Sequence, residues 1–207
     1  MATLTRSRPP VFNLPNQLTA SRFVLALILF GLIAYEHWLS CLAVFALASL
    51  TDYLDGYFAR KQGISSSLGR NLDPLVDKVL VCGAFIFLIP YGMPTGGEEH
   101  WLLPWMVTVV VARELIITSL RSYMEHAGGN FGADWLGKIK MGLQCAALIA
   151  IFVFLYARSN DPYNGTALWV FARLRDGFIW ATLAATALSG FQYLWRAYQI
   201  YQRDKNS

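Results

Sequence analysis

Charged residues are scarce in this chain of 207 residues. Asp, Glu, Lys and Arg make up 14% of the sequence and hydrophobic residues 56%, whereas soluble domains carry about 25% charged residues. The mean hydropathy is +0.41. This shortage of charge excludes an ordinary soluble globule and predicts a polytopic membrane protein, with a length that suits one compact unit of several helices.

Cysteine and histidine are also rare, with three residues of each. The cysteines (Cys41, Cys82 and Cys145) lie singly in apolar runs, which excludes zinc-type spacing and a disulfide framework. We expect them to be small buried hydrophobes. The histidines match no metal or triad spacing, and no small-residue cleavage pattern follows the first apolar run, so no cleavable signal peptide is expected.

Six apolar segments predict six transmembrane helices, at residues 20–35, 38–57, 75–91, 101–121, 136–157 and 177–195. Several contain fewer than the roughly 18 apolar residues of a clean span, so five or seven spans are alternatives, the latter if 166–180 forms a further short helix. The expected fold class is all-α, a six-helix integral membrane protein with a short juxtamembrane N-terminal segment. We expect a disordered or interfacial segment at 1–12, one domain over 13–201 and a polar tail at 202–207.

The basic residues indicate which side of the membrane each connection faces. With six spans, one side carries thirteen of them, namely Arg6, Arg8, Arg22, Arg60, Lys61, Arg70, Lys78, Arg121, Lys138, Lys140, Arg196, Arg203 and Lys205. The other side carries Arg158, Arg173 and Arg175, and Arg113 falls inside the fourth span. Because cytoplasmic connections are enriched in Lys and Arg, both termini are expected in the cytoplasm.

The polar stretch before the first apolar segment reads NLPNQLTASR, residues 13–22. Asn16 or Thr19 can accept hydrogen bonds from the free backbone N–H groups at a helix start. We therefore expect one of these two residues to cap the first helix.

Four aspartates lie in or beside segments that otherwise read as membrane helices, where a carboxylate is costly. Asp52 and Asp55 are spaced i, i+3, and Asp73 and Asp77 i, i+4, so each pair shares a helix face. Two antiparallel helices joined by a short polar linker would bring the four together at the cytoplasmic membrane edge. They cannot all stay ionised without counter-charge, and oxygen ligands without Cys or His favour Mg²⁺, Mn²⁺ or Ca²⁺. The alternative is a charge network with the neighbouring basic residues.

Small residues accompany the aspartates on the same helix faces. Gly56, Ala59 and Gly69 lack bulk, which leaves room for a ligand to approach the backbone, although small residues equally serve close helix packing in membranes. Arg60 can hold a phosphate or anchor the helix at the membrane interface. Spacing alone leaves both interpretations open.

The sequence DYLDGYFAR (52–60), followed by eight residues and GRNLDPLVD (69–77), resembles the signature of the CDP-alcohol phosphotransferase family at every defined position. Further stretches resemble the branch of this family that makes phosphatidylglycerol phosphate, namely NLPNQLTASR (13–22), LDPLVDK (72–78), ARE (112–114), LRSYMEHAG (120–128) and GKIKMGLQ (137–144). Met141 departs from that pattern, since a small or polar residue is expected after GKIK.

This resemblance implies a six-helix membrane enzyme, usually a homodimer, whose site opens to the cytoplasm of a bacterial inner membrane. The implied reaction transfers the phosphatidyl group of CDP-diacylglycerol to sn-glycerol 3-phosphate and releases CMP; no nucleic-acid partner is expected. The implied ligands of one or two Mg²⁺ or Mn²⁺ ions are Asp52, Asp55, Asp73 and Asp77, with Asp77 as general base. The residues implied to bind CDP-diacylglycerol are Asp52, Asp55, Gly56, Ala59, Arg60, Gly69, Asp73, Asn16 and Thr19.

The phosphate of the acceptor needs a cationic pocket, for which the candidates are Arg113, Arg121, Lys138 and Lys140. The two arginines lie nearly on one helix face, and the two lysines begin the next span on the same side. An arginine inside a span needs a partner, and Glu114 points about 100° away on a helix, so we expect a bound phosphate to be that partner. The alternative is that the basic residues at the span ends merely follow the cytoplasmic excess of positive charge.

Two rival functions remain open. The first is the same chemistry on serine, inositol phosphate or a second phosphatidylglycerol; the basic cluster argues against serine but not against inositol phosphate. The second is a cation transporter whose carboxylates form a conduction site. Carboxylates of that kind should lie near the bilayer midplane, whereas these cluster at one edge around a polar loop.

Overall fold

The structure, a computed structural model, is a bundle of α-helices described over residues 14–62, 67–93, 99–126, 135–160 and 165–205. The described residues form six helices and no strand: α1 (Leu14–Ala34), α2 (Trp38–Gln62), α3 (Ser67–Gly92), α4 (Pro104–His126), α5 (Trp135–Asn160) and α6 (Gly165–Lys205). For some residues only the helical path is described and not the side chain, namely 14–19, 52–62, 67–77, 121–126, 136, 196–197, 200–201 and 203–205.

The helices match the six apolar segments in number and order but extend beyond them. α3 begins at Ser67 rather than at residue 75, because polar residues continue the backbone hydrogen bonds of a helix as well as apolar ones do. Residues 166–180 form the first part of α6 and not a separate short helix. α1 begins at Leu14, so the prediction that Asn16 or Thr19 caps it is wrong; both lie inside the helix.

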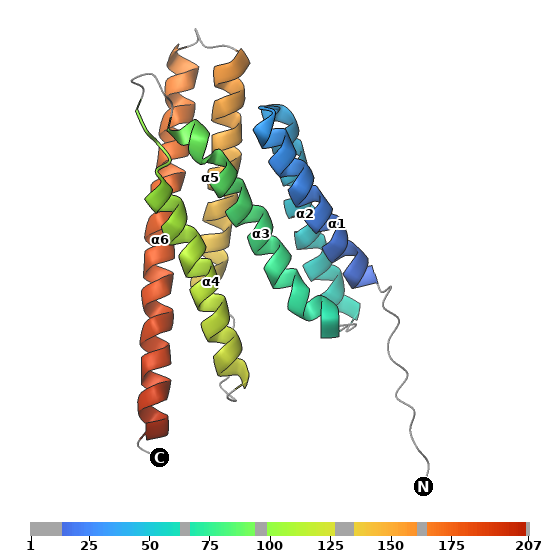
Figure 1. Ribbon diagram of the computed structural model, residues 1–207, viewed down its shortest axis with the longest axis vertical. Helices are drawn as coiled ribbons and strands as arrows, with labels where there is room; N and C mark the ends of the chain where they lie inside the picture. Colours follow the sequence, from blue (N-terminus) through green and yellow to red (C-terminus); the bar gives the residue numbers. More distant parts are fainter. Residues whose placement is uncertain (1–13, 63–66, 94–98, 127–134, 161–164, 206–207) are drawn as a thin grey trace.

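Successive helices run in opposite directions (Figure 1). The start of α1, the end of α6 and the ends that lead from α2 to α3 and from α4 to α5 lie at the same end of the bundle, which we call the inner end. α5 packs along α6 and against α2, α1 packs on α2 and α3, and α4 packs on α3 and α6. The aspartate-bearing turns of α2 and α3 therefore belong to the inner end.

Aromatic side chains fix α3 against α1. The rings of Phe30 and Phe87 stack with centroids 4.9 Å apart, and the Tyr91 hydroxyl donates a hydrogen bond to the Ile33 carbonyl at 2.9 Å. Gly83 permits this close approach, since a Cβ at that position would overlap the Phe30 ring. Buried apolar side chains elsewhere fill the interior. Of the three cysteines predicted to be buried, Cys41 and Cys82 are buried and Cys145 is partly buried.

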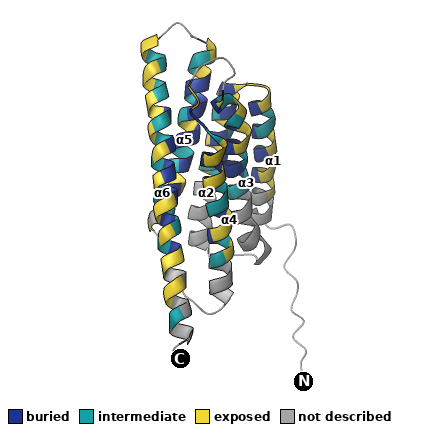
Figure 2. Ribbon diagram, turned by 60° about the vertical axis from the view of Figure 1, so that its left-hand side comes forward, coloured by how far each residue is buried: buried dark blue, intermediate teal, exposed yellow. Residues whose placement is uncertain are grey.

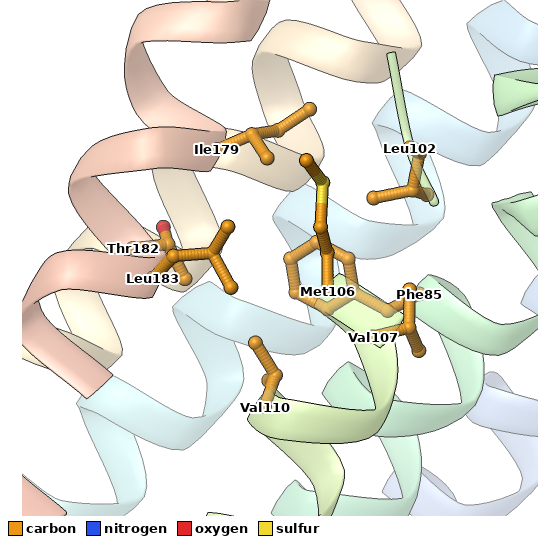
Figure 3. A pocket seen from close by; sticks show the side chains of 8 residues that line it. All are labelled: Phe85, Leu102, Met106, Val107, Val110, Ile179, Thr182 and Leu183. Carbon is orange, nitrogen blue, oxygen red and sulfur yellow. The ribbon is translucent and has the colours of Figure 1, made fainter. Parts of the chain in front are cut away.

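The core between α3, α4 and α6 is closely packed. A void of about 10 Å³ remains there, lined by Phe85, Leu102, Met106, Val107, Val110, Ile179, Thr182 and Leu183 (Figure 3). This is roughly the space of one water molecule. Apart from Thr182 the lining is apolar, so the void belongs to the core and cannot hold a substrate.

Large apolar side chains also cover the outer surface of the bundle. On α1, Phe23 and Leu27 are exposed, and on α6 Leu188 and Phe191 are 65% and 71% exposed. Figure 2 shows exposed residues running along α6 on the side that no other helix covers. A helix that is apolar on both its inward and outward sides is typical of an apolar environment rather than of water.

One stretch within the described residues, Gly137–Asn160 in α5, is long and apolar enough to cross a membrane, with a mean hydropathy of 2.0. Three further helical stretches are apolar but shorter, namely Ala20–Ala34, Trp38–Thr51 and Lys78–Gly92. Length and composition therefore support a membrane helix at one of the six helices.

A buried arginine joins three parts of the chain at the other end of the bundle, which we call the outer end. The Arg175 guanidinium of α6 lies 4.4 Å from the ring centroid of Trp101, just before α4, and 4.1 Å from that of Phe154 in α5. Its Nε donates to Asp176 Oδ1 at 2.8 Å, and the residue is 5% exposed. Cation–π contacts are strongest when water is excluded, so this group should hold α4, α5 and α6 together.

We expect Arg175→Ala to lower the free energy of unfolding by roughly 2–4 kcal/mol, because it removes two desolvated cation–π contacts and leaves a gap between two rings. Thermal unfolding in detergent micelles measures the change. Arg173→Ala is the matched control: Arg173 lies on the same helix, is exposed, and contacts one ring, that of Trp169, at 5.3 Å. Equal melting temperatures for the two variants would contradict this role of Arg175.

Candidate functional site

The four aspartates lie where α2 ends and α3 begins. Asp52 and Asp55 are in the C-terminal part of α2, and Asp73 and Asp77 are in the N-terminal part of α3. Both helix segments are at the inner end of the bundle (Figure 1). The side chains of these residues lie outside those that the structure describes, so their convergence stays a prediction.

The residues predicted to bind the nucleotide fall in the same segments. Gly56, Ala59 and Arg60 are in the last turns of α2, and Gly69 is in the first turn of α3. Asn16 and Thr19 are in the first turns of α1, whose start lies at the same end of the bundle. Their side chains are likewise outside the described set. The backbone thus brings all these helix ends to one end of the bundle, as the prediction requires.

A cavity lined by both charged and apolar residues lies next to these segments, between α3, α4 and α5. It has a volume of about 200 Å³ and is lined by Lys78, Val81, Cys82, Glu114, Gly137, Lys140, Met141 and Gln144. Lys78 directly follows Asp77 in α3, so the cavity adjoins the aspartate-bearing turns. Drug-sized ligands occupy pockets of about 300–1,000 Å³; this smaller cavity suits a small metabolite.

A buried carboxylate, Glu114 of α4, is the centre of the polar groups around the cavity. Its Oε1 accepts a hydrogen bond from Lys140 Nζ and another from Gln144 Nε2 at 3.2 Å, both from α5. Arg113 NH1 lies 3.4 Å from the same oxygen. Glu114, Lys140 and Gln144 are 6%, 5% and 3% exposed, and a buried charge is stable only when it is paired and hydrogen-bonded in this way.

Lys78 of α3 is held by the face of α4 that carries Glu114. Lys78 Nζ donates to Thr118 Oγ1, and Thr118 Oγ1 in turn donates to the Glu114 carbonyl at 2.6 Å. Glu114 and Thr118 are spaced i, i+4 and therefore share one helix face. This face thus contacts Lys78 of α3 and Lys140 of α5, both of which line the cavity.

Arg113 lies between α4 and α6 rather than in the lining of the cavity. Its guanidinium is 5.8 Å from the ring centroid of Tyr193, and its Cγ would lie 3.7 Å from a Cβ at Gly190. The expectation that Glu114 is not its partner is wrong. The Cα–Cβ directions of neighbouring residues do diverge by about 100°, but the arginine side chain is long enough to fold back to the carboxylate.

The other two predicted phosphate ligands lie apart from this cluster or outside the described side chains. Lys138 is exposed on α5, and the cavity lining does not include it. Arg121 lies in the last turns of α4, and its side chain is not described. Of the three predicted phosphate ligands whose side chains the structure describes, Lys140 is the one in the cavity wall.

Among the side chains that the structure describes, the charge balance around the cavity is positive. Lys78, Lys140 and Arg113 are three cations, and Glu114 is the one carboxylate that the described side chains contribute to the cluster. Arg113 Nε is buried and has no hydrogen-bond partner among the described residues. A cluster of this kind attracts a small anion with several acceptor oxygens, such as a phosphate.

The residues of the aspartate segments fit a divalent cation by their chemistry. The predicted ligands are all carboxylates, the oxygen donors that Mg²⁺ and Mn²⁺ prefer. Among the residues whose side chains the structure describes, no three of His, Cys, Asp and Glu come together, so that part of the chain offers no competing metal site. The fit of a metal to Asp52, Asp55, Asp73 and Asp77 is therefore consistent with the backbone and remains a prediction.

Glu114, Gln144 and Thr118 are site residues that the sequence analysis missed. Two signals could have found them. Lys140 and Gln144 are spaced i, i+4 on a helix, as are Glu114 and Thr118, so two polar pairs occupy single faces of otherwise apolar helices. A carboxylate on one such face and a lysine on the other predict an interhelical ion pair.

Comparison with known proteins identifies the family. The family model of CDP-alcohol phosphatidyltransferase matches residues 12–188. Three bacterial relatives bear the name CDP-diacylglycerol–glycerol-3-phosphate 3-phosphatidyltransferase. The Bacillus subtilis (strain 168) protein is 31% identical over 200 residues, covering 88% of this chain and 94% of the relative. The Pectobacterium atrosepticum protein is 32% identical over 194 residues, covering 88% and 93%.

The third relative, from Salmonella choleraesuis, is 33% identical over 180 residues, which cover 83% of this chain and 92% of the relative. The family match includes all of α2 to α5, hence both the aspartate segments and the cavity. The chain therefore belongs to the CDP-alcohol phosphatidyltransferase family.

Proposed function

We propose that this protein transfers the phosphatidyl group of CDP-diacylglycerol to sn-glycerol 3-phosphate, giving phosphatidylglycerol phosphate and CMP. Relatives about 30% identical over most of the chain bear the name of this activity. The structural observation that carries the proposal is the cavity beside the start of α3, lined by Lys78 and Lys140. An acceptor that brings its own phosphate needs such cations, whereas an uncharged alcohol does not.

The reaction is a displacement at phosphorus. The bond that forms joins a hydroxyl oxygen of glycerol 3-phosphate to the lipid-side phosphorus of CDP-diacylglycerol. The bond that breaks joins this phosphorus to the bridging oxygen of the pyrophosphate, which leaves with CMP. The proton of the attacking hydroxyl passes to the Asp77 carboxylate, because an aliphatic hydroxyl is a poor nucleophile until a positioned base removes its proton.

All four aspartates hold a divalent metal, a role that Asp77 has in addition to that of general base. In this proposal Asp52, Asp55, Asp73 and Asp77 are the ligands of one or two Mg²⁺ or Mn²⁺ ions. When bound, such an ion supplies positive charge against the pyrophosphate oxygens and the departing CMP. Gly56, Ala59 and Gly69 leave space for the cytidine, with Arg60, Asn16 and Thr19 beside it.

The acceptor enters the cavity with its phosphate toward the lysines. Lys140 and Lys78 stand at the walls of the cavity and face the phosphate oxygens as donors. Since Lys78 follows Asp77, a phosphate held there keeps the hydroxyl of a short acceptor near the base. Arg121 and Lys138, together with Arg113 buried behind Glu114, add positive charge near the cavity, which draws the dianion in.

The membrane arrangement that we propose has six spans with both termini and the site in the cytoplasm of a bacterial inner membrane. The alternating direction of the helices, the apolar outer surface and the basic residues near the inner end support it. α5 alone among the described helical stretches meets the length and hydropathy expected of a span. The family resemblance adds the proposal of a homodimer.

Asp77→Asn should reduce the rate of CMP release by roughly 10²–10⁴-fold, since it removes the general base. The rate is measured with CDP-diacylglycerol and glycerol 3-phosphate in mixed micelles. Glu99→Gln, at an exposed position before α4, is the control and should leave the rate unchanged. An Asp77→Asn variant with the rate of the unaltered protein, or one that loses only a cation flux across vesicles, would argue against a transferase that uses Asp77.

Removal of divalent metal should stop CMP release, because nothing would then offset the charge of the pyrophosphate against the four carboxylates. The protein is treated with EDTA, and Mg²⁺ or Mn²⁺ is then returned in excess. We expect loss of activity followed by recovery with either ion. Undiminished activity in EDTA would show that the aspartates work without a metal.

The acceptor is tested by supplying CDP-diacylglycerol with one labelled alcohol at a time. Incorporation of label into lipid is expected from glycerol 3-phosphate and not from serine, because serine carries no phosphate to bind the lysines of the cavity. Inositol phosphate and phosphatidylglycerol complete the set of acceptors. Label from inositol phosphate but not from glycerol 3-phosphate would refute the choice of acceptor and leave the reaction class intact.

A further inference from the structure

We propose that Glu114 is a positioning residue that holds Lys140 at the cavity wall, in place to bind the phosphate of the acceptor. Arg113 fixes the carboxylate from the side of α6. This proposal rests on the proposed function, because it assigns a role in binding the acceptor of that reaction. It gives Arg113 an indirect role through Glu114, where the sequence predicted direct contact with the phosphate.

The geometry around the carboxylate supports this role. A single oxygen of Glu114 receives Lys140 Nζ and Gln144 Nε2 from α5 and faces Arg113 NH1 of α4. Because the donors approach from two directions, they fix the orientation of the Glu114 carboxylate. Gly190 and Tyr193 of α6 contact Arg113 from behind, so the carboxylate and its neighbours are held by three helices.

Lys140 needs such a partner. Its ammonium ends a flexible four-carbon stem that loses considerable rotamer freedom when fixed. The residue is 5% exposed, and a buried ammonium without a counter-charge is strongly disfavoured. Lys78, which lines the same cavity, adds a like charge. Without Glu114, Lys140 would lose both its counter-charge and its fixed position at the cavity wall.

Glu114 itself is unsuited to bind the acceptor's phosphate. Both groups are anions, so direct contact between them would be repulsive. Its contacts run instead to the cations that surround the cavity. The effect of Glu114 on the acceptor must therefore pass through Lys140, which is what separates a positioning residue from a binding residue.

The central experiment is Glu114→Gln in the full-length protein, which removes the negative charge and keeps the shape of the side chain. KM for glycerol 3-phosphate should rise about ten- to hundredfold, the loss expected for one hydrogen bond to a charged group. KM for CDP-diacylglycerol should change less than about twofold. An unchanged KM for glycerol 3-phosphate, or equal rises for both substrates, would overturn the proposal.

A double-mutant cycle with Lys140→Met tests whether Glu114 acts through Lys140. Residues that act as one unit give strongly non-additive effects. We expect KM for glycerol 3-phosphate in the double variant to be no higher than in Lys140→Met alone. Multiplied effects of the two substitutions would show that Glu114 acts independently of Lys140 and would overturn the proposal.

Asp176→Asn is the matched control, since it removes the carboxylate partner of another buried basic residue, Arg175, at the outer end of the bundle. It should lower the melting temperature without changing KM for glycerol 3-phosphate. A rise in that KM similar to the one in Glu114→Gln would show that any loss of a buried ion pair has this effect, which would overturn the specific role of Glu114.

Two further outcomes are distinguished in advance. If Glu114→Gln does not fold, the same cycle uses Glu114→Asp, which keeps the charge and moves it by one methylene. A Glu114→Asp variant that folds and has a raised KM for glycerol 3-phosphate supports the proposal. A Glu114→Asp variant that also fails to fold shows that Glu114 is a structural residue and overturns the proposal. If the unaltered protein itself releases no CMP with glycerol 3-phosphate, the proposed function fails, and the assignment of Glu114 to this acceptor falls with it.

Discussion

A charge removed from water must find a partner, and this constraint organises the polar part of the bundle. The helices are apolar on their inward and outward sides, so water does not solvate the ionisable groups inside the bundle. Glu114 meets the constraint by accepting hydrogen bonds from two residues of α5 and from Arg113 of its own helix. Arg175 meets it differently, with two aromatic rings and one carboxylate.

The Arg175 group and the Glu114 cluster lie at opposite ends of the bundle and have different roles. At the outer end the buried cation is enclosed by its partners, and its role is cohesion. At the inner end Lys78 and Lys140 line a space large enough for a small molecule, and their partners Thr118 and Glu114 sit on one helix face. Between the two ends, the apolar core of α3, α4 and α6 has almost no free volume (Figure 3). Substrate chemistry therefore belongs to one end of the bundle.

The sequence was a good guide to what depends on periodicity and composition. Hydropathy predicted six helices, and the spacing of the aspartates placed Asp52 and Asp55 on one helix and Asp73 and Asp77 on the next. The family resemblance was confirmed by the match over residues 12–188. These features are local in the chain, or common to many sequences, and need no knowledge of how the helices pack.

What the sequence could not predict depends on packing between helices. The partner of Lys140 lies on a different helix, and nothing local to either helix fixes their relative rotation. Helix geometry alone directs Arg113 away from Glu114, but its long side chain reaches back to that carboxylate; whether Arg113 also contacts a phosphate stays a prediction. The start of α1 was misjudged because polar residues were read as a boundary, whereas they continue the helix from Leu14.

The enclosure of Arg175 also bears on how α6 can move. With its guanidinium held between Trp101 and Phe154, α6 has a fixed pivot near its start. Tyr193 lies on the same helix about 27 Å farther along, so a tilt of about 5° around the pivot would displace it by about 2 Å. Because the ring of Tyr193 lies 5.8 Å from the Arg113 guanidinium, a displacement of this size would reach the polar cluster around Glu114 and leave the contacts of Arg175 nearly unchanged.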